Sequence, residues 1–335
     1  MRLHLILFIL WGFSIGCYNP STEKNSKTES ELNIPIIDID NALSNISNTP
    51  FKCSEFIEDI EYIPLETNNK SLLGGLRGVQ ILATPEFVYC DLKKFNIKTG
   101  RYINLIGKQR GRGPGEFIMA IGSATDLTDN RVFVLANENH KILVYDKDNN
   151  FIKKIDVLPQ IRGISYLGDN RLILFRADIV SLYDNTGPFE YQILNLIDER
   201  IIYTREIVKI SEATNGKKEK RFYSYGIGRN SNWYYDNKVQ YYESFTDTIF
   251  TIEKNGKRIP RFFVNRKNNK PPFSEILDNG SFERNRPKYI EIISVFETPR
   301  YLFFNIKRGL KEGSYYARFD KLKPLVLRYK SNKFN

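Results

Sequence analysis

A glycine-rich stretch of the sequence has the composition of an anion-binding loop. Gly107 to Glu116 contains four glycines and three cations, Lys108, Arg110 and Arg112. Glycines let backbone N–H groups turn towards an anion, and arginines bind phosphate or carboxylate through two parallel hydrogen bonds. The spacing matches neither the G-x-x-x-x-G-K-[ST] nor the G-x-G-x-x-G phosphate motif. We therefore keep two interpretations, an anion site that uses Arg110 and Arg112 and a plain connection between strands.

Three consecutive aromatic residues, Trp233, Tyr234 and Tyr235, form a second candidate site. They stand directly before the turn residues Asp236 and Asn237, in a stretch that is dense in aromatic side chains. Exposed aromatic rings stack on sugar rings or bases, whereas aromatic side chains in strands usually pack against a neighbouring sheet. The three residues are therefore candidates for a ligand platform, with packing between sheets as the alternative.

Histidine and cysteine are scarce, which argues against a clustered metal site and a disulfide-stapled scaffold. The chain has two His and three Cys. His140 is expected in a solvated loop. Cys53 and Cys90 are expected to be buried thiols, with a disulfide between them, which export would permit, as the alternative. The run Asp146 to Asn150 lacks the glycine and glutamate that complete a calcium loop. No pair of carboxylates stands out for acid–base chemistry. We therefore expect no metal, no cofactor and no catalytic residue.

The first residues of the chain have the pattern of an export signal. Arg2 precedes an apolar run from Leu3 to Phe13, and Gly16 and Cys17 follow. A helix between Arg2 and Cys17 would rise about 21 Å, which is too short for a hydrocarbon core of roughly 30 Å. Residues 1–16 are therefore expected to be a cleaved signal peptide.

Gly16 and Cys17 resemble the lipobox of bacterial lipoproteins, although Ser14 stands where that motif usually has leucine. The resemblance implies that Cys17 is acylated and becomes the mature N-terminus. The alternative is an ordinary secretory signal that is cut near Gly16. Residues 17–32 contain this cysteine and a polar stretch that is expected to be a flexible tether. The folded domain is expected over residues 33–335.

The elements that must position these residues are short β-strands. Aromatic residues make up 13% of the chain, and β-branched and aromatic runs alternate with turns of Asn, Asp, Gly and Lys. The clearest unit, residues 121–157, contains four short strands joined by tight turns, as in one propeller blade. Four similar units contain Phe87, Leu172, Val239 and Tyr301, one in each unit. With residues 121–157 this gives five blade-like units.

The spacing of these units predicts where the chain carries extra segments. The turn after the third strand of each unit is expected near residues 100, 150, 187, 256 and 323. The last two intervals are too long for bare blades. Insertions are therefore expected around residues 199–222 and 265–288.

Three segments carry a resemblance to a known family, Tyr62–Thr67, Gly107–Phe117 and Lys141–Ile155. On these segments, residues 34–330 resemble the six-bladed β-propeller lipoproteins of Bacteroidetes, which are related to NHL-repeat propellers. The resemblance implies an all-β propeller of four-stranded antiparallel blades, and it makes Gly107–Glu116 a crossover between blades. Five units are one fewer than six. A strand at Ile34–Asp40 or Ile57–Pro64 is therefore expected to complete the last blade.

The same resemblance implies an outer-membrane lipoprotein that captures a glycan or a peptide beside a nutrient-uptake system. We interpret the chain as a non-catalytic binding or interaction module. The alternative is a propeller lyase or hydrolase that acts on a sugar or peptide at the central channel.

The charge distribution bears on the partners. The net charge is +11, and residues 199–335 alone carry +14. A basic face attracts acidic glycans, lipid head groups or acidic proteins. The expected partners are therefore the membrane, through the lipid on Cys17, and a glycan, a peptide or an envelope protein. An exported protein is not expected to bind nucleic acid.

Overall fold

The computed structural model describes residues 34–44, 54, 56–73, 81–109, 111, 113–136, 140–176, 189–206, 231–244, 246–272, 275, 279–308, 314–323 and 325–330. The chain divides into two units, residues 1–33 and 34–335. All the described residues belong to the second unit. The expected signal peptide, Cys17 and the tether lie outside the described residues, as do Cys53, Arg110 and Arg112.

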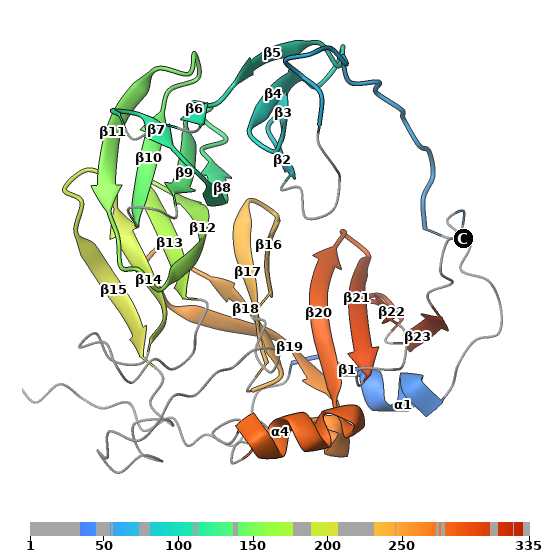
Figure 1. Ribbon diagram of the computed structural model, residues 1–335. Coiled ribbons are helices and arrows are strands. Elements are labelled where there is room, and N and C mark those ends of the chain that lie inside the picture. The colour runs from blue at the N-terminus through green and yellow to red at the C-terminus, as the bar shows by residue number, and fades with distance from the viewer. Residues whose placement is uncertain are drawn as a thin grey trace, which may run out of the picture. The chain divides into compact units, whose positions relative to one another are not determined.

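The second unit is an all-β propeller in which five blades of four antiparallel strands are described (Figure 1). The first blade holds β2 (Ile81–Ala83), β3 (Phe87–Cys90), β4 (Lys93–Asn96) and β5 (Tyr102–Leu105). The second holds β8 (Ala120–Thr125), β9 (Val132–Ala136), β10 (Lys141–Tyr145) and β11 (Phe151–Asp156).

The remaining three blades follow in chain order. The third holds β12 (Ile161–Gly168), β13 (Arg171–Arg176), β14 (Phe189–Asn195) and β15 (Ile201–Glu206). The fourth holds β16 (Ser231–Tyr235), β17 (Lys238–Glu243), β18 (Thr248–Ile252) and β19 (Arg258–Asn265). The fifth holds β20 (Ile290–Glu297), β21 (Tyr301–Arg308), β22 (Ser314–Asp320) and β23 (Leu325–Lys330).

Consecutive blades pack through apolar faces that contain aromatic residues. Phe133 of the second blade stacks on Tyr166 of the third at 5.6 Å between ring centroids, and Phe175 of the third stacks on Tyr241 of the fourth at 5.7 Å. First strands of neighbouring blades also meet, because β8 contacts β12 and β16 contacts β20. The β-branched and aromatic runs that the sequence shows thus form strands whose side chains pack one blade against the next.

The N-terminal strand does not complete the last blade, so that expectation is wrong. β1 (Ile36–Asp38) pairs in parallel with β19, with Ile36 opposite Phe263, and becomes a fifth strand of the fourth blade. α1 (Ile39–Ser44) follows and contacts both β19 and β23. The other expected strand, at 57–64, forms no strand either. β23 is itself the fourth strand of the fifth blade, which therefore needs no N-terminal strand.

The expected insertions are confirmed in one place and wrong in part in the other. Residues 267–288 hold η3 (Lys267–Asn269), α4 (Asn279–Asn285) and η4 (Arg286–Lys288). Residues 201–206 are the outer strand β15 of the third blade rather than an insertion, and residues 207–222 lie outside the described residues. The turn expected near 187 instead follows β14, at 196–200. In the portion of the chain that the structure describes, no helix is both long and apolar enough to cross a bilayer.

Candidate functional site

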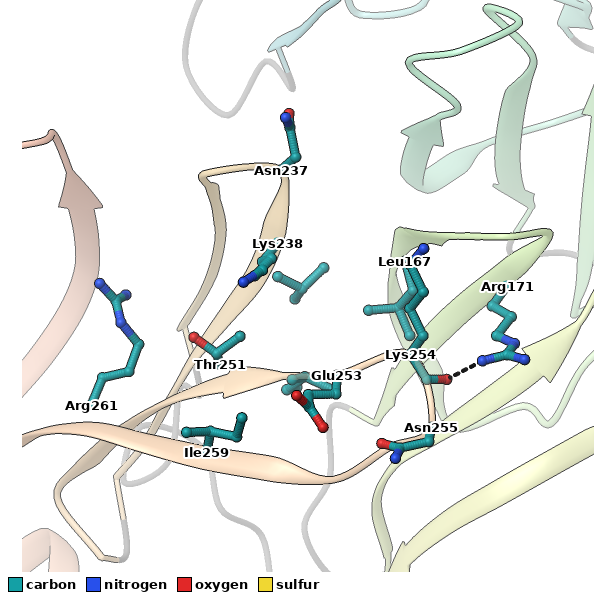
Figure 2. Close-up of a pocket in the computed structure, with 12 residues that line it drawn as sticks. Leu167, Arg171, Asn237, Lys238, Thr251, Glu253, Lys254, Asn255, Ile259 and Arg261 are labelled. Carbon is teal, nitrogen blue, oxygen red and sulfur yellow. Dashed lines mark hydrogen bonds between the residues drawn. The ribbon is translucent and has the colours of Figure 1, made fainter. Parts of the chain in front are cut away.

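A groove of about 610 Å³ is lined by residues of the third and fourth blades, near the ends of their hairpins (Figure 2). The third blade contributes Leu167 and Arg171, which flank the β12–β13 turn. The fourth blade contributes residues of the β16–β17 and β18–β19 turns and the strands beside them. Buried Val239 and Ile252 line the groove, and half-exposed Ile259 adds further apolar surface. The groove therefore combines apolar walls with the polar residues of the turns.

Two short turns place cations at this groove. Asp169 and Asn170 have φ angles of +49° and +55°, and Asp236 and Asn237 have +52° and +53°. Two successive residues with positive φ are typical of the type I′ hairpin turn, and Asp and Asn tolerate this conformation better than most residues. The next residue starts the second strand of its blade, and it is Arg171 in β13 and Lys238 in β17. The conformation of each turn thus determines the positions of Arg171 and Lys238.

Neither Arg171 nor Lys238 was expected from the sequence, although a repeated signal marks both. The order Asp-Asn-cation occurs at residues 129–131, 169–171 and 236–238. In the first copy Arg131 is used within the fold, because its guanidinium lies 2.9 Å from the buried carboxylate of Asp126. In the other two copies the cations, Arg171 and Lys238, line the groove.

Four cations and one carboxylate are among the described residues that line the groove. The cations are Arg171, Lys238, Lys254 and Arg261, and the carboxylate is Glu253. Figure 2 shows Arg261 on one side of the fourth-blade strands and Arg171 and Lys254 on the other. The carbonyl of Lys254 accepts a hydrogen bond from Arg171 at 3.0 Å, while its ammonium lies 2.8 Å from Asp169 outside the lining. The lining therefore favours an anion.

A β-bulge aims Arg261. Ile249 pairs with Phe262 and Phe250 pairs with Pro260, so Arg261 is an extra residue in β19, and such a bulge redirects a side chain. Its guanidinium donates to both carboxylate oxygens of Glu297, at 2.7 and 2.9 Å, and to the amide oxygen of Gln240 at 2.8 Å. The side chain keeps 21% of its surface exposed. Arg261 is therefore held rigidly and still meets solvent in the groove.

Glu297 accepts from two further donors. Lys321 donates at 2.7 Å and the indole N–H of Trp233 at 3.0 Å, and the carboxylate side chain is fully buried. Burial disfavours the charged form of Glu297. Hydrogen bonds from Arg261, Lys321 and Trp233 outweigh this effect and hold the pKa of the carboxyl group below its usual range. Glu297 therefore stays charged at neutral pH and holds Arg261 in place.

The three aromatic residues predicted as a platform lie on both sides of β16. Trp233 packs against the core of the fourth and fifth blades, and Tyr235 lies beneath Lys321, whose ammonium is 4.2 Å from the ring centroid. Tyr234 points the other way and donates its hydroxyl hydrogen to the carbonyl of Tyr166 in the third blade, at 2.6 Å. Strand alternation separates them, because successive side chains of a strand face opposite sides. None of the three lines the groove itself; Tyr234, which faces the third blade, pairs with the lining residue Val239, and Tyr235 lies 5.3 Å from the guanidinium of the lining residue Arg261.

A second cluster of charges is buried between the same two blades. The Glu190 and Glu243 side chains are 4% and 5% exposed, and Arg258 lies 3.5 and 2.6 Å from them. Glu190 is the bulged residue of β14, since Phe189 pairs with Glu206 and Tyr191 with Arg205. Burial and the charge of Glu243 raise the pKa of Glu190 well above its usual range. Burial opposes ionisation of Glu243 too, but Arg258 and neighbouring hydrogen bonds lower its pKa. Burial thus favours the neutral form of Glu190, whereas Arg258 favours the charged form of Glu243.

The glycine-rich loop ties the first two blades together. β6 (Lys108–Gln109) and β7 (Glu116–Phe117) pair in parallel. The N–H of Gly107 donates to the side chain of Asn149 at 2.7 Å, and the hydroxyl of Tyr145 donates to the carbonyl of Gly115 at 2.8 Å. The N–H of Gly113 is taken by the loop's own Glu116 carboxylate, at 2.9 Å. These contacts favour the crossover interpretation.

His140 and Cys90, the other described candidates, are not among the residues that line the groove. His140 has a φ of +47° in the turn before β10, where its carbonyl accepts from Val157. Cys90 is a buried free thiol, and burial raises its pKa. Within the described ranges, no group of three or more His, Cys, Asp or Glu side chains is placed to hold a metal ion. The chemistry that the groove itself offers is the binding of an anion.

Two solved structures share the fold. A protein of Bacteroides fragilis NCTC 9343 that is described as exported aligns with a TM-score of 0.67 and 20% identity, covering 88% of this chain and 80% of its own. A member of the DUF4221 family from Bacteroides vulgatus aligns with a TM-score of 0.52 and 11% identity, covering 80% of this chain and 84% of its own. At these identities the likeness concerns the fold alone. No curated protein matches the sequence.

A family model fits the whole propeller unit. It matches residues 34–335, which include all five blades, the N-terminal strand β1 and the helical insertion after β19. The match excludes the N-terminal unit of residues 1–33. The chain therefore belongs to the DUF4934 family, a domain of unknown function.

Proposed function

We propose that this propeller is a membrane-tethered binding module that holds a carboxylate-bearing glycan or peptide in the groove between its third and fourth blades, without catalysing a reaction. The observation that carries the proposal is the lining of the groove. The cations Arg171, Lys238 and Arg261 line about 610 Å³, together with Lys254, whose ammonium is paired with Asp169, and with Glu253 as the one carboxylate among the described lining residues. Capture of this kind suits a protein that stands beside an outer-membrane uptake system.

The physical basis is electrostatic attraction at a partly enclosed surface. A cleft lined by one sign of charge concentrates ligands of the opposite sign, and guanidinium groups bind carboxylates through paired hydrogen bonds. Arg261 is already fixed by Glu297, so little side-chain entropy is lost when a ligand reaches it. Attraction of this type weakens as salt screens the charges, over about 10 Å at 0.1 M ionic strength.

Reversing one charge of the groove tests the proposal. Lys238→Glu is expected to weaken the binding of oligogalacturonate or oligoglutamate by about tenfold at low salt, because it replaces an exposed attractive charge with a repulsive one. Isothermal titration calorimetry of the full chain measures the dissociation constants. Lys98→Glu, at an exposed turn of the first blade, is the matched control. Equal effects of both substitutions, or no binding of either ligand, would show that the groove is not an anion site.

Membrane attachment through Cys17 is the second part of the proposal. The sequence before this residue has the pattern of an export signal, and the structurally similar Bacteroides fragilis protein is described as exported. Each methylene of an acyl chain that enters the bilayer contributes about 0.8 kcal/mol, so several chains give durable anchoring.

Replacement of Cys17 removes the attachment point. Cys17→Ser is expected to abolish incorporation of radiolabelled palmitate and to move the protein out of the membrane fraction, since serine lacks the thiol that is acylated. Metabolic labelling followed by fractionation measures both effects, with Cys90→Ser as the control because that thiol is buried in the fold. An unsubstituted chain that carries no label would rule out the lipid anchor and leave the groove proposal standing.

A further inference from the structure

We infer that the ligand of the groove is an acidic glycan, with a sugar ring stacked on Tyr234 and its carboxylate held by the cations. The inference rests on the groove binding proposed above and narrows its ligand class. It arises from Tyr234, the exposed ring of the Trp233–Tyr235 run, which stands next to the lining residue Val239.

Tyr234 is fixed next to two lining residues. It pairs directly with Val239 across β16 and β17, and Val239 lines the groove. Its hydroxyl donates to the carbonyl of Tyr166 at 2.6 Å, and the following residue, Leu167, lines the groove from the third blade. Both ends of the side chain are therefore fixed next to lining residues, one end by the strand pairing with Val239 and the other by the hydrogen bond to Tyr166, which precedes Leu167.

Tyr234 also keeps a large exposed surface, at 44%. Its equivalents in the blade interfaces, such as Tyr241, are fully buried. An aromatic ring that is both held in place and exposed offers a flat apolar face at little entropic cost. The C–H face of a pyranose ring matches such a surface, because it is flat and apolar while the hydroxyl groups project around its rim.

The remaining lining suits a sugar acid better than an acidic peptide. The carboxylates of an acidic peptide need only the cations, so an acidic peptide would make no use of the exposed ring. A sugar acid uses the ring for stacking and Arg171 for its carboxylate, both on the side of the third blade. The amide groups of Asn237 and Asn255 line the same groove and offer hydrogen-bond donors for hydroxyl groups. A sugar acid can thus use all three contacts, namely ring stacking, a carboxylate bound by a cation and hydroxyl groups bound by amides.

The test compares three probes on the full chain by isothermal titration calorimetry. They are tetragalacturonate, a neutral galactose tetramer and tetra-L-glutamate. Tetragalacturonate is expected to bind, and Tyr234→Ala is expected to weaken it by about tenfold, the size of effect seen when a stacking ring is removed. Tyr234→Phe keeps the ring and loses the hydrogen bond to the carbonyl of Tyr166, so it is expected to weaken binding by less than about threefold. Tetraglutamate binding is expected to be unchanged by Tyr234→Ala.

Controls and contrary outcomes separate this inference from the proposed function. Tyr316→Ala removes a ring of the fifth blade that is 45% exposed, and it is expected to change no affinity. If Tyr234→Ala does not fold, Tyr234→Leu keeps apolar volume without a flat face and is expected to show the same loss. Tetraglutamate binding tighter than tetragalacturonate, with no effect of Tyr234→Ala or Tyr234→Leu, overturns the glycan inference and leaves anion binding intact. Binding of neither anion overturns both.

Discussion

Replacing Arg258 by methionine is expected to lower the free energy of unfolding by about 3 to 5 kcal/mol. The Arg258 side chain is 12% exposed and lies 2.6 Å from Glu243. Methionine keeps the packing against the ring of Phe250, which Arg258 covers at 4.2 Å, but removes the charge. The carboxylate of Glu243 then remains buried without a cation, which costs far more than the loss of an exposed ion pair. Urea denaturation at neutral pH measures the difference.

A compensating substitution shows whether charge or packing is responsible. Arg258→Met combined with Glu243→Gln removes both charges, so it is expected to regain more than roughly half of the lost free energy. A loss below about 1 kcal/mol for Arg258→Met alone is the size expected of a solvated surface pair. That result would contradict the description of Glu190, Glu243 and Arg258 as a buried cluster that joins the third and fourth blades.

Glu297→Gln is expected to lower the free energy of unfolding at pH 7 by about 3 kcal/mol. Glutamine keeps the shape of the side chain, but Arg261 and Lys321 lose the charge that they share. The pKa of Glu297 is lowered in the fold, so its contribution is present above the unfolded value of about 4.3 and is lost as the pH falls through the folded value. The unsubstituted chain should therefore lose stability in acid more steeply than the variant.

Urea midpoints between pH 3 and pH 7 measure both parts of this prediction. The matched control is Glu199→Gln, because Glu199 forms a half-exposed pair with Lys153 on the outer edges of the second and third blades. That substitution is expected to cost less than about 1 kcal/mol. Parallel pH profiles for the unsubstituted chain and Glu297→Gln would mean that Glu297 is not the charged anchor of Arg261.

Much of the blade structure could be predicted because it is local. The apolar run in Lys141–Tyr145 and the turn residues after it indicate a hairpin directly, and the structure has β10 and β11 there. The Trp–Tyr–Tyr run also ends where the Asp236-Asn237 turn was expected. Short-range turn chemistry and strand period suffice for such elements.

Elements that depend on distant partners could not be predicted in the same way. The third strand of the third blade was placed too early, because Asp184 to Gly187 has stronger turn residues than the actual turn at 196–200. β1 is three residues long and gains its stability from parallel pairing with β19, more than 200 residues away in the chain. Neither length nor composition of so short a strand indicates its partner.

The site could be predicted only in fragments. The repeated Asp-Asn-cation order was visible in the sequence, but which copies face a groove depends on how blades pack. Arg261 and Glu190 owe their directions to β-bulges, whose positions follow from register rather than residue type. Tyr234 was among the candidates, yet its separation from Trp233 and Tyr235 required knowing that all three lie in one strand.

The most direct test of anion binding in the groove is a crystal structure of the full chain with tetragalacturonate. We predict that the ligand lies between the third and fourth blades, with a carboxylate within hydrogen-bond distance of Arg171 or Arg261 and a sugar ring against Tyr234. Ligand bound instead at the Gly107–Glu116 loop, with the groove holding none, would contradict the assignment of the groove as the binding site.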